Sequence, residues 1–319
     1  AIEWTTGSTS EVLVRCANNS AVIYSAATGS IRNELRSRTK NILNVAWSPD
    51  GTKIATAHAN KTALVWNASD AQEILNLSGA TGPVNGVRWS PDDSKIAAVS
   101  DDEMPILWSA LTGKKIMNLQ RHLWQVYAVN WSPDGTKVAT AGWDSTAIIW
   151  SAATGEKLLT LKGHTNTVED VEWSPDGTKL LTASTDRTAM IWSAETGKRL
   201  FRLDHTQQVL SAKWSPDGTT IVTCGPIYSA TLWSALTGKQ SFSLNGHHGV
   251  VYKAVWSPDG KKIATVSNDL TSILWSVETG TAIRTLHGHS EPMVYLAWSP
   301  DGTKLATASN DKSAIIWSA

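Results

Sequence analysis

Cysteine, long apolar runs and any excess of charge are what this sequence has least of. Its 319 residues include 2 cysteines, which is too few for a scaffold held together by disulfides. No stretch approaches the roughly 20 apolar residues that a membrane-spanning helix needs, and no signal peptide is recognisable. We therefore predict a soluble protein without a membrane partner. Its compartment stays open, with the cytoplasm favoured over secretion.

The charges cancel, because 28 Lys and Arg residues stand against 28 Asp and Glu residues. A protein without a positive excess has no long-range attraction for nucleic acid, so we expect no nucleic-acid partner. Motifs of catalysis are also missing: there is no Gly-rich phosphate loop, no zinc-binding pair of cysteines and no His-Glu-x-x-His sequence. We expect no cofactor and no metal, and an enzyme is the least favoured class of function.

Tryptophan, in contrast, is abundant, and its 17 copies follow a regular repeat. One tryptophan opens the motif Trp-Ser-Pro-Asp, whose seven copies follow one another at steps of 42 residues, with one step of 41: Trp47, Trp89, Trp131, Trp173, Trp214, Trp256 and Trp298. A second tryptophan closes each unit: Trp66, Trp108, Trp150, Trp192, Trp233, Trp275 and Trp317. One period earlier stand Trp4 and Tyr24, which indicates an eighth, diverged unit at the N-terminus.

Each unit reads as four short β-strands, which we name a, b, c and d. In residues 163–203 apolar residues recur at two-residue spacing in four short runs, and a Pro-Asp-Gly turn at 175–177 separates the first two. This spacing indicates strands, and no run with helical spacing occurs. A sheet of about 40 residues cannot bury its faces alone, so the units are expected to stack on one another.

The Trp-Ser-Pro-Asp-Gly and Ile-Trp-Ser-Ala signatures at this spacing resemble the WD-repeat (WD40-type) β-propeller family, and the resemblance covers residues 1–319. It implies an all-β fold, with a single β-propeller domain of four-stranded blades. Eight blades, the last lacking its outer strand, are favoured over seven, in which strand d of the first unit would complete the last blade. The expected units are approximately 1–37, 38–79, 80–121, 122–163, 164–204, 205–246, 247–288 and 289–319.

Histidine, serine and aspartate recur at fixed spacing in several units, and such a set could suggest a hydrolase triad. The resemblance implies a different role for these residues. The family places such groups, with a tryptophan, in a hydrogen-bonded tetrad that ties the d–a loop to strands b and c. Unit five carries the set His164, Ser184, Asp186 and Trp192, and units seven and eight repeat it. Because an enzyme needs its triad only once, a structural role is favoured.

Several units depart from this set. Unit four has Gly142 in place of the serine, unit six keeps only His205 and Trp233, and units one to three lack the histidine. We expect the N-terminal units and unit six to be the softer blades. Cys16 and Cys224 fall in non-adjacent units, so a disulfide between them is not expected.

Partners of such propellers usually bind the face formed by the d–a and b–c loops. Trp124, Tyr127 and Trp143 all belong to unit four and are expected to lie together there, where aromatic clusters make favoured anchors. Alternatively, these rings pack on one another and fill a gap left by Gly142. The candidate partner-binding residues are Trp124, Tyr127, Trp143, Leu43, Leu210 and Tyr252.

The favoured function is a non-enzymatic scaffold that binds a protein or peptide through this face. The alternative is a lectin-like, multivalent carbohydrate binder, in which sugar-contacting residues would recur in every blade. The loop residues differ between units, which favours one asymmetric protein site. A last blade without its outer strand would also leave an open sheet edge, through which we expect a homo-oligomer or a partner contact.

Overall fold

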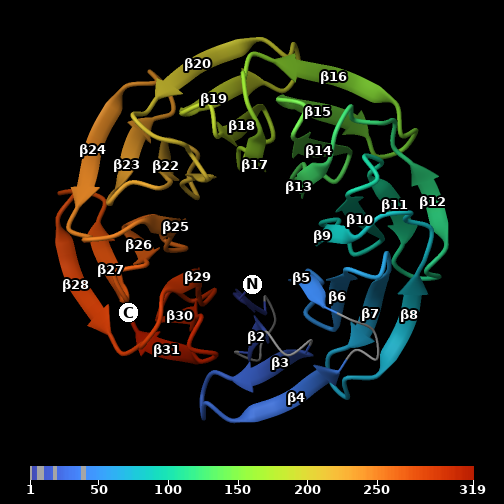
Figure 1. The fold of residues 1–319 in the computed structure, drawn as a ribbon, viewed down its shortest axis with the longest axis horizontal. Coiled ribbons are helices and arrows are strands. Elements are labelled where there is room, and N and C mark those ends of the chain that lie inside the picture. Colours follow the sequence, from blue (N-terminus) through green and yellow to red (C-terminus); the bar gives the residue numbers. More distant parts are fainter. Residues whose placement is uncertain (1, 6–10, 17–19, 37–40) are drawn as a thin grey trace. The chain divides into compact units, whose positions relative to one another are not determined.

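The computed structural model describes residues 2–5, 11–16, 20–36 and 41–319. This described part contains 31 β-strands and no helix, and the strands form eight sheets (Figure 1). The chain divides into two compact units, one from Glu3 to Lys162 and one from Gly163 to Ala319, and each holds four sheets.

The first compact unit contains blades one to four. Its strands are β1 (Ile2–Trp4), β2 (Glu11–Arg15), β3 (Ser20–Ser25), β4 (Ile31–Arg36), β5 (Ile42–Trp47), β6 (Lys53–His58), β7 (Ala63–Asn67), β8 (Glu73–Leu77), β9 (Val84–Trp89), β10 (Lys95–Ser100), β11 (Ile106–Ser109), β12 (Lys115–Asn118), β13 (Val126–Trp131), β14 (Lys137–Gly142), β15 (Thr146–Ser151) and β16 (Lys157–Lys162).

The second compact unit contains blades five to eight. Its strands are β17 (Val168–Trp173), β18 (Lys179–Ser184), β19 (Thr188–Ser193), β20 (Arg199–Asp204), β21 (Ser211–Trp214), β22 (Thr220–Cys224), β23 (Ser229–Ser234), β24 (Gln240–Asn245), β25 (Val251–Trp256), β26 (Lys262–Ser267), β27 (Thr271–Ser276), β28 (Ala282–His287), β29 (Met293–Trp298), β30 (Lys304–Ser309) and β31 (Ala314–Ser318).

The fold class is the predicted one, an all-β β-propeller fold with eight blades. Seven sheets have four strands in the order a, b, c, d, and the last sheet has three, β29-β30-β31. The first sheet keeps its own outer strand, in the order β1-β2-β3-β4, so the seven-bladed alternative is not adopted.

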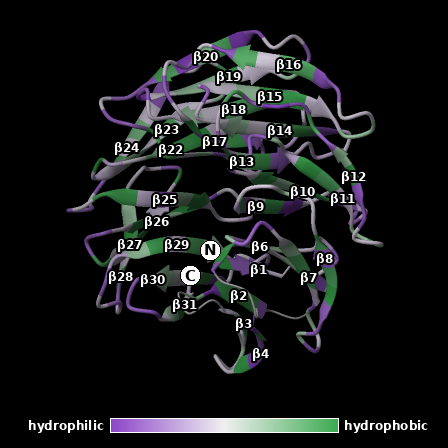
Figure 2. Cartoon of the chain, turned by 45° about the vertical axis from the view of Figure 1, so that its right-hand side comes forward, coloured by the Kyte–Doolittle hydropathy of each residue, from purple (hydrophilic) through white to green (hydrophobic). Residues whose placement is uncertain are grey.

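Apolar residues between consecutive sheets explain why the blades stack. One core cluster joins Val99 and Leu107 of blade three to Val126, Trp131 and Trp150 of blade four, and all five side chains are buried. Strands b and c of blade five, β18 and β19, are buried almost throughout, whereas the outer strands β16 and β20 mix hydrophobic and hydrophilic residues (Figure 2). Within each compact unit, consecutive sheets therefore shield the apolar faces of one another, as expected for a repeat that cannot fold alone.

The a–b turn shows why Trp-Ser-Pro-Asp-Gly-Thr-Lys recurs. In blade four Ser132 Oγ donates to Asp134 Oδ1 at 2.6 Å and accepts the Lys137 N–H at 2.9 Å. The Thr136 N–H bonds the same Asp134 oxygen at 3.0 Å. Gly135 has a φ of +68°, a left-handed conformation that favours glycine. Most residues of the motif therefore have a task in closing the turn.

Strand a carries a β-bulge at its second residue in most blades. In β13 the ladder passes from the pair Val126–Gly142 to the pair Ala128–Ala141, so Tyr127 has no opposite residue. A bulge re-aims the side chain that it leaves unpaired. This position is the one predicted to line the binding face.

Candidate protein-binding face

Blade four ties its d–a loop to its own sheet by a chain of hydrogen-bonded side chains. Trp150 Nε1 donates to Thr140 Oγ1 at 2.7 Å, and the same oxygen lies 2.7 Å from His122 Nε2. The other ring nitrogen, His122 Nδ1, lies 2.9 Å from Asp144 Oδ2, which also accepts the Leu123 N–H at 3.1 Å. Because the Thr140 oxygen accepts the proton of Trp150, its own hydroxyl proton can be donated to His122 Nε2, which leaves Nδ1 to donate to Asp144.

Asp144, the aspartate of this hydrogen-bonded tetrad, stays ionised over a wide pH range. Burial on its own would raise the pKa of Asp144, but hydrogen bonds from His122, Thr146 and the Leu123 N–H outweigh it and hold the pKa well below its usual value. An ionised Asp144 fixes the d–a loop on one side and the b–c turn on the other.

The bridging hydroxyl belongs to threonine, and the prediction of serine in this place is wrong. In blade five Thr182 Oγ1 lies 2.7 Å from His164 Nε2 and 2.9 Å from Trp192 Nε1. Ser184 instead accepts the Asp186 N–H at 3.1 Å, inside the b–c turn. Residues 182 and 184 share a face of the strand, but only the Thr182 hydroxyl lies within hydrogen-bond distance of both the His164 and the Trp192 ring nitrogens. The same threonine serves blades four, seven and eight: Thr140, Thr265 and Thr307.

Two corrections follow for individual blades. Blade four was expected to have a partial tetrad because of Gly142, yet its tetrad is complete through Thr140. Blade two lacks the histidine of the d–a loop in its sequence, as expected, but His58 on β6 was not predicted to take part and stands at the position that Ser184 holds in blade five. His58 Nε2 lies 2.8 Å from Thr56 Oγ1, which also accepts Trp66 Nε1–H at 2.8 Å.

Blades two and six leave a ring nitrogen without a partner. His58 Nδ1 and His205 Nε2 are buried, and neither finds a hydrogen-bond partner among the residues that the structure describes. At the position of the tetrad aspartate, blade six has Ile227. Burial lowers the pKa of His58 and of His205 to about 4, so both rings are neutral at pH 7.

These groups do not form an accessible nucleophile. In each tetrad that retains its histidine and aspartate, the imidazole is buried and the threonine hydroxyl is engaged by both the histidine and the tryptophan. A hydrolase triad needs a hydroxyl that a substrate can reach. Within residues 2–5, 11–16, 20–36 and 41–319, no cluster of three His, Cys, Asp or Glu side chains could hold a metal ion.

The tetrad of blade four places large apolar side chains in solvent. Leu123 and Trp124 directly follow His122 in the d–a loop, and they are 79% and 61% exposed. Trp143 directly precedes Asp144 in the b–c turn and is 51% exposed. Leu123 was not among the predicted residues, although its place beside the tetrad histidine could have marked it.

Tyr127 and Trp143 lie together, as predicted. Their ring centroids are 5.8 Å apart in an edge-to-face arrangement, and the Tyr127 hydroxyl donates to Gln125 Oε1 at 3.2 Å. Trp143 is held in turn by its N–H, which bonds the Gln125 carbonyl at 3.0 Å. The alternative reading is half right: Tyr127 and Trp143 do pack on one another, but they do not fill a gap left by Gly142. A Cβ on Gly142 would lie 2.3 Å from the Gln125 carbonyl, so the loop backbone already occupies that space.

The remaining predicted residues are partly buried. Leu43 and Tyr252 take the bulged position of β5 and β25, and Leu210 precedes β21, where its N–H bonds the Cys224 carbonyl at 3.0 Å. Trp124 is not part of the Tyr127–Trp143 ring pair.

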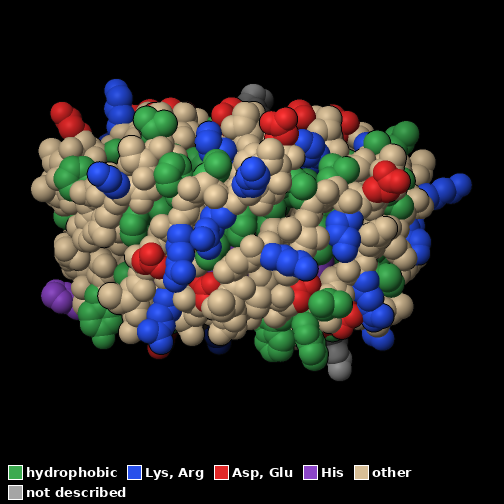
Figure 3. Space-filling model, turned by 90° about the horizontal axis from the view of Figure 1, so that it is seen from above, with side chains coloured by type: hydrophobic (Ala, Val, Ile, Leu, Met, Phe, Trp, Pro, Cys, Tyr) green, Lys and Arg blue, Asp and Glu red, His purple; other side chains and the backbone are tan. Residues whose placement is uncertain are grey.

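The same two positions hold different chemistry in different blades. In blade three, Asn85 replaces Tyr127 and Asp101 replaces Trp143, and their side chains bond each other at 2.7 Å. In blade five the two residues are Glu169 and Thr185. The loop ends therefore vary while the tetrads below them repeat. On the side seen in Figure 3, basic, acidic and apolar side chains are interspersed, in keeping with the balanced charge.

Comparison with protein families agrees with this architecture. The family model described as WD40, WD domain, G-beta repeat matches the chain seven times, at residues 29–67, 71–109, 113–151, 155–193, 197–228, 238–276 and 280–318. The chain belongs to the WD40 family. WD40 propellers typically act as scaffolds for protein interactions. No curated protein matches the chain.

The WD40 matches number seven although the blades number eight. Each match begins near strand d of one blade and runs into the next blade, where six matches end in strand c and the match at 197–228 ends just before it. The match at 113–151, for example, covers β12 of blade three and β13–β15 of blade four. Strands β1–β3 precede the first match. Among the described residues no helix is both long and apolar enough to cross a membrane.

Proposed function

We propose that this WD40 protein is a non-catalytic scaffold that binds a protein or peptide partner through the d–a/b–c loops of blade four. The observation that carries the proposal is the exposed group Leu123, Trp124 and Trp143, with Tyr127 beneath Trp143. Exposed aromatic residues on a rigid support are favoured anchors at protein interfaces, because they bury a large apolar area at little cost in side-chain entropy.

Rigidity of the support is the second argument. The backbone on both sides of this group is tied to Asp144, by the Leu123 N–H in one loop and by the Thr146 N–H and hydroxyl in the other. Loops held in this way lose little freedom on binding, which favours affinity. The polar pair Asn85–Asp101 at the same positions in blade three supports a single asymmetric site over a repeated, lectin-like one.

The experiment is an affinity capture with the wild-type chain and with a variant carrying Tyr127→Ala and Trp143→Ala, followed by mass spectrometry. Leu236→Ala serves as the matched control, because Leu236 is 83% exposed but lies in the c–d turn of blade six. A partner that binds this site is recovered by the wild type and the control and lost from the double variant. Circular dichroism and urea midpoints check that all three proteins are folded.

Two outcomes contradict the proposal. Equal recovery of every partner by the folded double variant removes the site from consideration. Strong multivalent binding on a glycan array, with no protein partner, favours the lectin-like function instead.

A further inference from the structure

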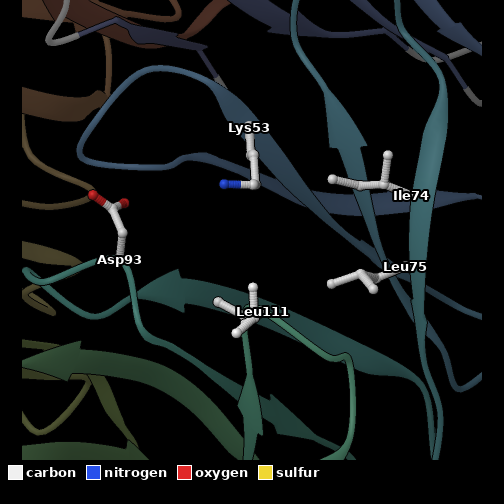
Figure 4. A pocket seen from close by; sticks show the side chains of 6 residues that line it. Lys53, Ile74, Leu75, Asp93 and Leu111 are labelled. Carbon is white, nitrogen blue, oxygen red and sulfur yellow. The ribbon is translucent and has the colours of Figure 1, made fainter.

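A pocket opens between blades two and three, at the end of the sheets that carries the a–b and c–d turns. It encloses about 300 Å³ and is lined by Lys53, Ile74, Leu75, Asp93, Ala110 and Leu111 (Figure 4). The Lys53 Nζ points to the Asp93 side, and Ile74 and Leu75 lie on the opposite side. One end of the pocket is therefore charged and the other is aliphatic.

Asp93 is the residue that the fold does not explain. It stands at the turn position that is glycine in the other copies of the motif, such as Gly51 and Gly135, and its φ is +59°. Left-handed backbone at a residue other than glycine costs roughly 1 kcal/mol or more, and such strain concentrates at functional sites. Asp93 Oδ1 is buried and makes no hydrogen bond. The turn itself closes through Asp92, whose carboxylate takes the role seen in the other blades.

The opposite charge comes from Lys53. Its Nζ makes no hydrogen bond or ion pair within the part of the chain that the structure describes, although the side chain is partly buried. Burial and the nearby Asp50 carboxylate raise the pKa of Asp93, whereas a hydrogen bond from the Asp50 backbone and the charge of Lys53 lower it. Asp93 therefore keeps one buried oxygen, Oδ1, for which the described residues supply no hydrogen bond, and Lys53 is the cation that lies nearest to that carboxylate across the pocket.

We propose that this pocket binds a free α-amino acid with a branched aliphatic side chain. The ammonium group of the ligand meets Asp93, its carboxylate meets Lys53, and its side chain packs on Ile74, Leu75 and Leu111. A volume of about 300 Å³ stands at the small end of ligand pockets and suits a molecule of this size. The proposal goes beyond the protein-binding function and does not depend on it, because the pocket lies at the other turns of the sheets.

The repeat supplies an internal comparison. At the corresponding place in blades five and six stand Lys179, Leu200, Phe201 and Leu236, but Gly218 replaces Asp93. That place lacks the carboxylate, and the larger Phe201 takes the position of Leu75. Only the place between blades two and three combines both charges with the aliphatic wall.

The test is calorimetric titration with L-leucine, 4-methylpentanoic acid, which lacks the ammonium group, and 3-methylbutan-1-amine, which lacks the carboxylate. We expect leucine to bind and each analogue to bind about tenfold more weakly, since each loses one charge-assisted contact. Asp93→Gly should weaken the binding of leucine about tenfold, because the carboxylate is lost. The unfolding midpoint should stay unchanged or rise, because glycine is the residue that the turn prefers.

Leu111→Ala, at a residue 86% exposed on the pocket rim, should also weaken leucine, whereas the matched Leu236→Ala should not. Absence of heat and of amide shifts in NMR spectra at roughly 20 mM leucine would overturn the proposal, since a millimolar site would be filled at that concentration. Equal leucine affinity of the wild type and Asp93→Gly would overturn it as well.

Discussion

At the scale of single residues, one threonine per blade joins the loop to the sheet. Thr182 Oγ1 serves His164 and Trp192 together, whereas Thr223 Oγ1 in blade six serves Trp233 but not His205. The two positions are otherwise equivalent, so they form a natural pair for measuring the bridge.

We predict that Thr182→Val lowers the free energy of unfolding by about 3 kcal/mol, because it leaves two buried polar groups without a partner. Thr223→Val leaves one such group and should cost about half as much. Urea unfolding followed by tryptophan fluorescence measures both. A Thr223→Val cost equal to or above that of Thr182→Val would contradict the assigned bridge.

The buried histidines make stability depend on pH. The pKa of His58 falls from 6.5 in the unfolded chain to about 4 in the folded protein. Between these two pKa values the unfolded chain binds more protons than the folded protein. The contribution of the neutral His58 ring to the free energy of unfolding is therefore fully present above pH 6.5 and declines as the pH falls towards 4. For one group the slope approaches 1.4 kcal/mol per pH unit.

We expect His58→Ser, which introduces the serine found at this position in blades five, seven and eight, to remove that contribution. The measurement is the unfolding free energy at pH 7, 6, 5 and 4 for both proteins. The variant can be less stable at pH 7 through lost packing, but its decline below pH 6.5 should be shallower. Parallel curves for the two proteins would contradict the neutral state of the buried ring.

At the scale of elements, strand positions could be predicted because each strand keeps its two-residue spacing and each turn keeps its glycine. The four strands expected within residues 163–203 agree with β17 to β20. The bulge at Tyr127 could not be predicted, since an extra residue in one strand leaves no mark on the apolar pattern. The spacing also predicted Ser184 in place of Thr182, because both residues lie on one strand face and the spacing does not say which hydroxyl reaches the histidine and the tryptophan.

The last sheet differs from the others in its outer strand. Among the described residues β31 pairs with β30 alone, whereas the equivalent β27 lies between β26 and β28. Residues Ala314–Trp317 are partly buried, while Ser272–Trp275 are buried. A strand with one free edge opens more readily and can pair with another chain.

We predict faster hydrogen exchange for the amides of β31 than for those of β27, and self-association at raised protein concentration through the β31 edge. Exchange followed by mass spectrometry tests the first part, and light scattering over a range of concentrations tests the second. Equal protection of the two strands, together with a monomer at every concentration, would argue against an open edge.

At the scale of the whole molecule, the eight-bladed fold followed from counting tryptophans, because stacked repeats constrain one another. The binding residues followed less completely. Tyr127 and Trp143 were predicted to meet, since equivalent positions of a repeat share one end of the sheet, but Leu123 and Asp93 depend on local departures from the repeat. We propose that binding takes place where the blades differ, and that the repeated positions mainly stabilise the fold.

The most direct test of the claim that the partner binds where the blades differ is hydrogen–deuterium exchange of the protein alone and with a captured partner. The account predicts slower exchange on binding at residues 121–127 and 142–145, which carry the loops of blade four, and no change at the c–d turn 109–114. Protection confined to that turn, or spread evenly over the repeated a–b turns, would contradict it.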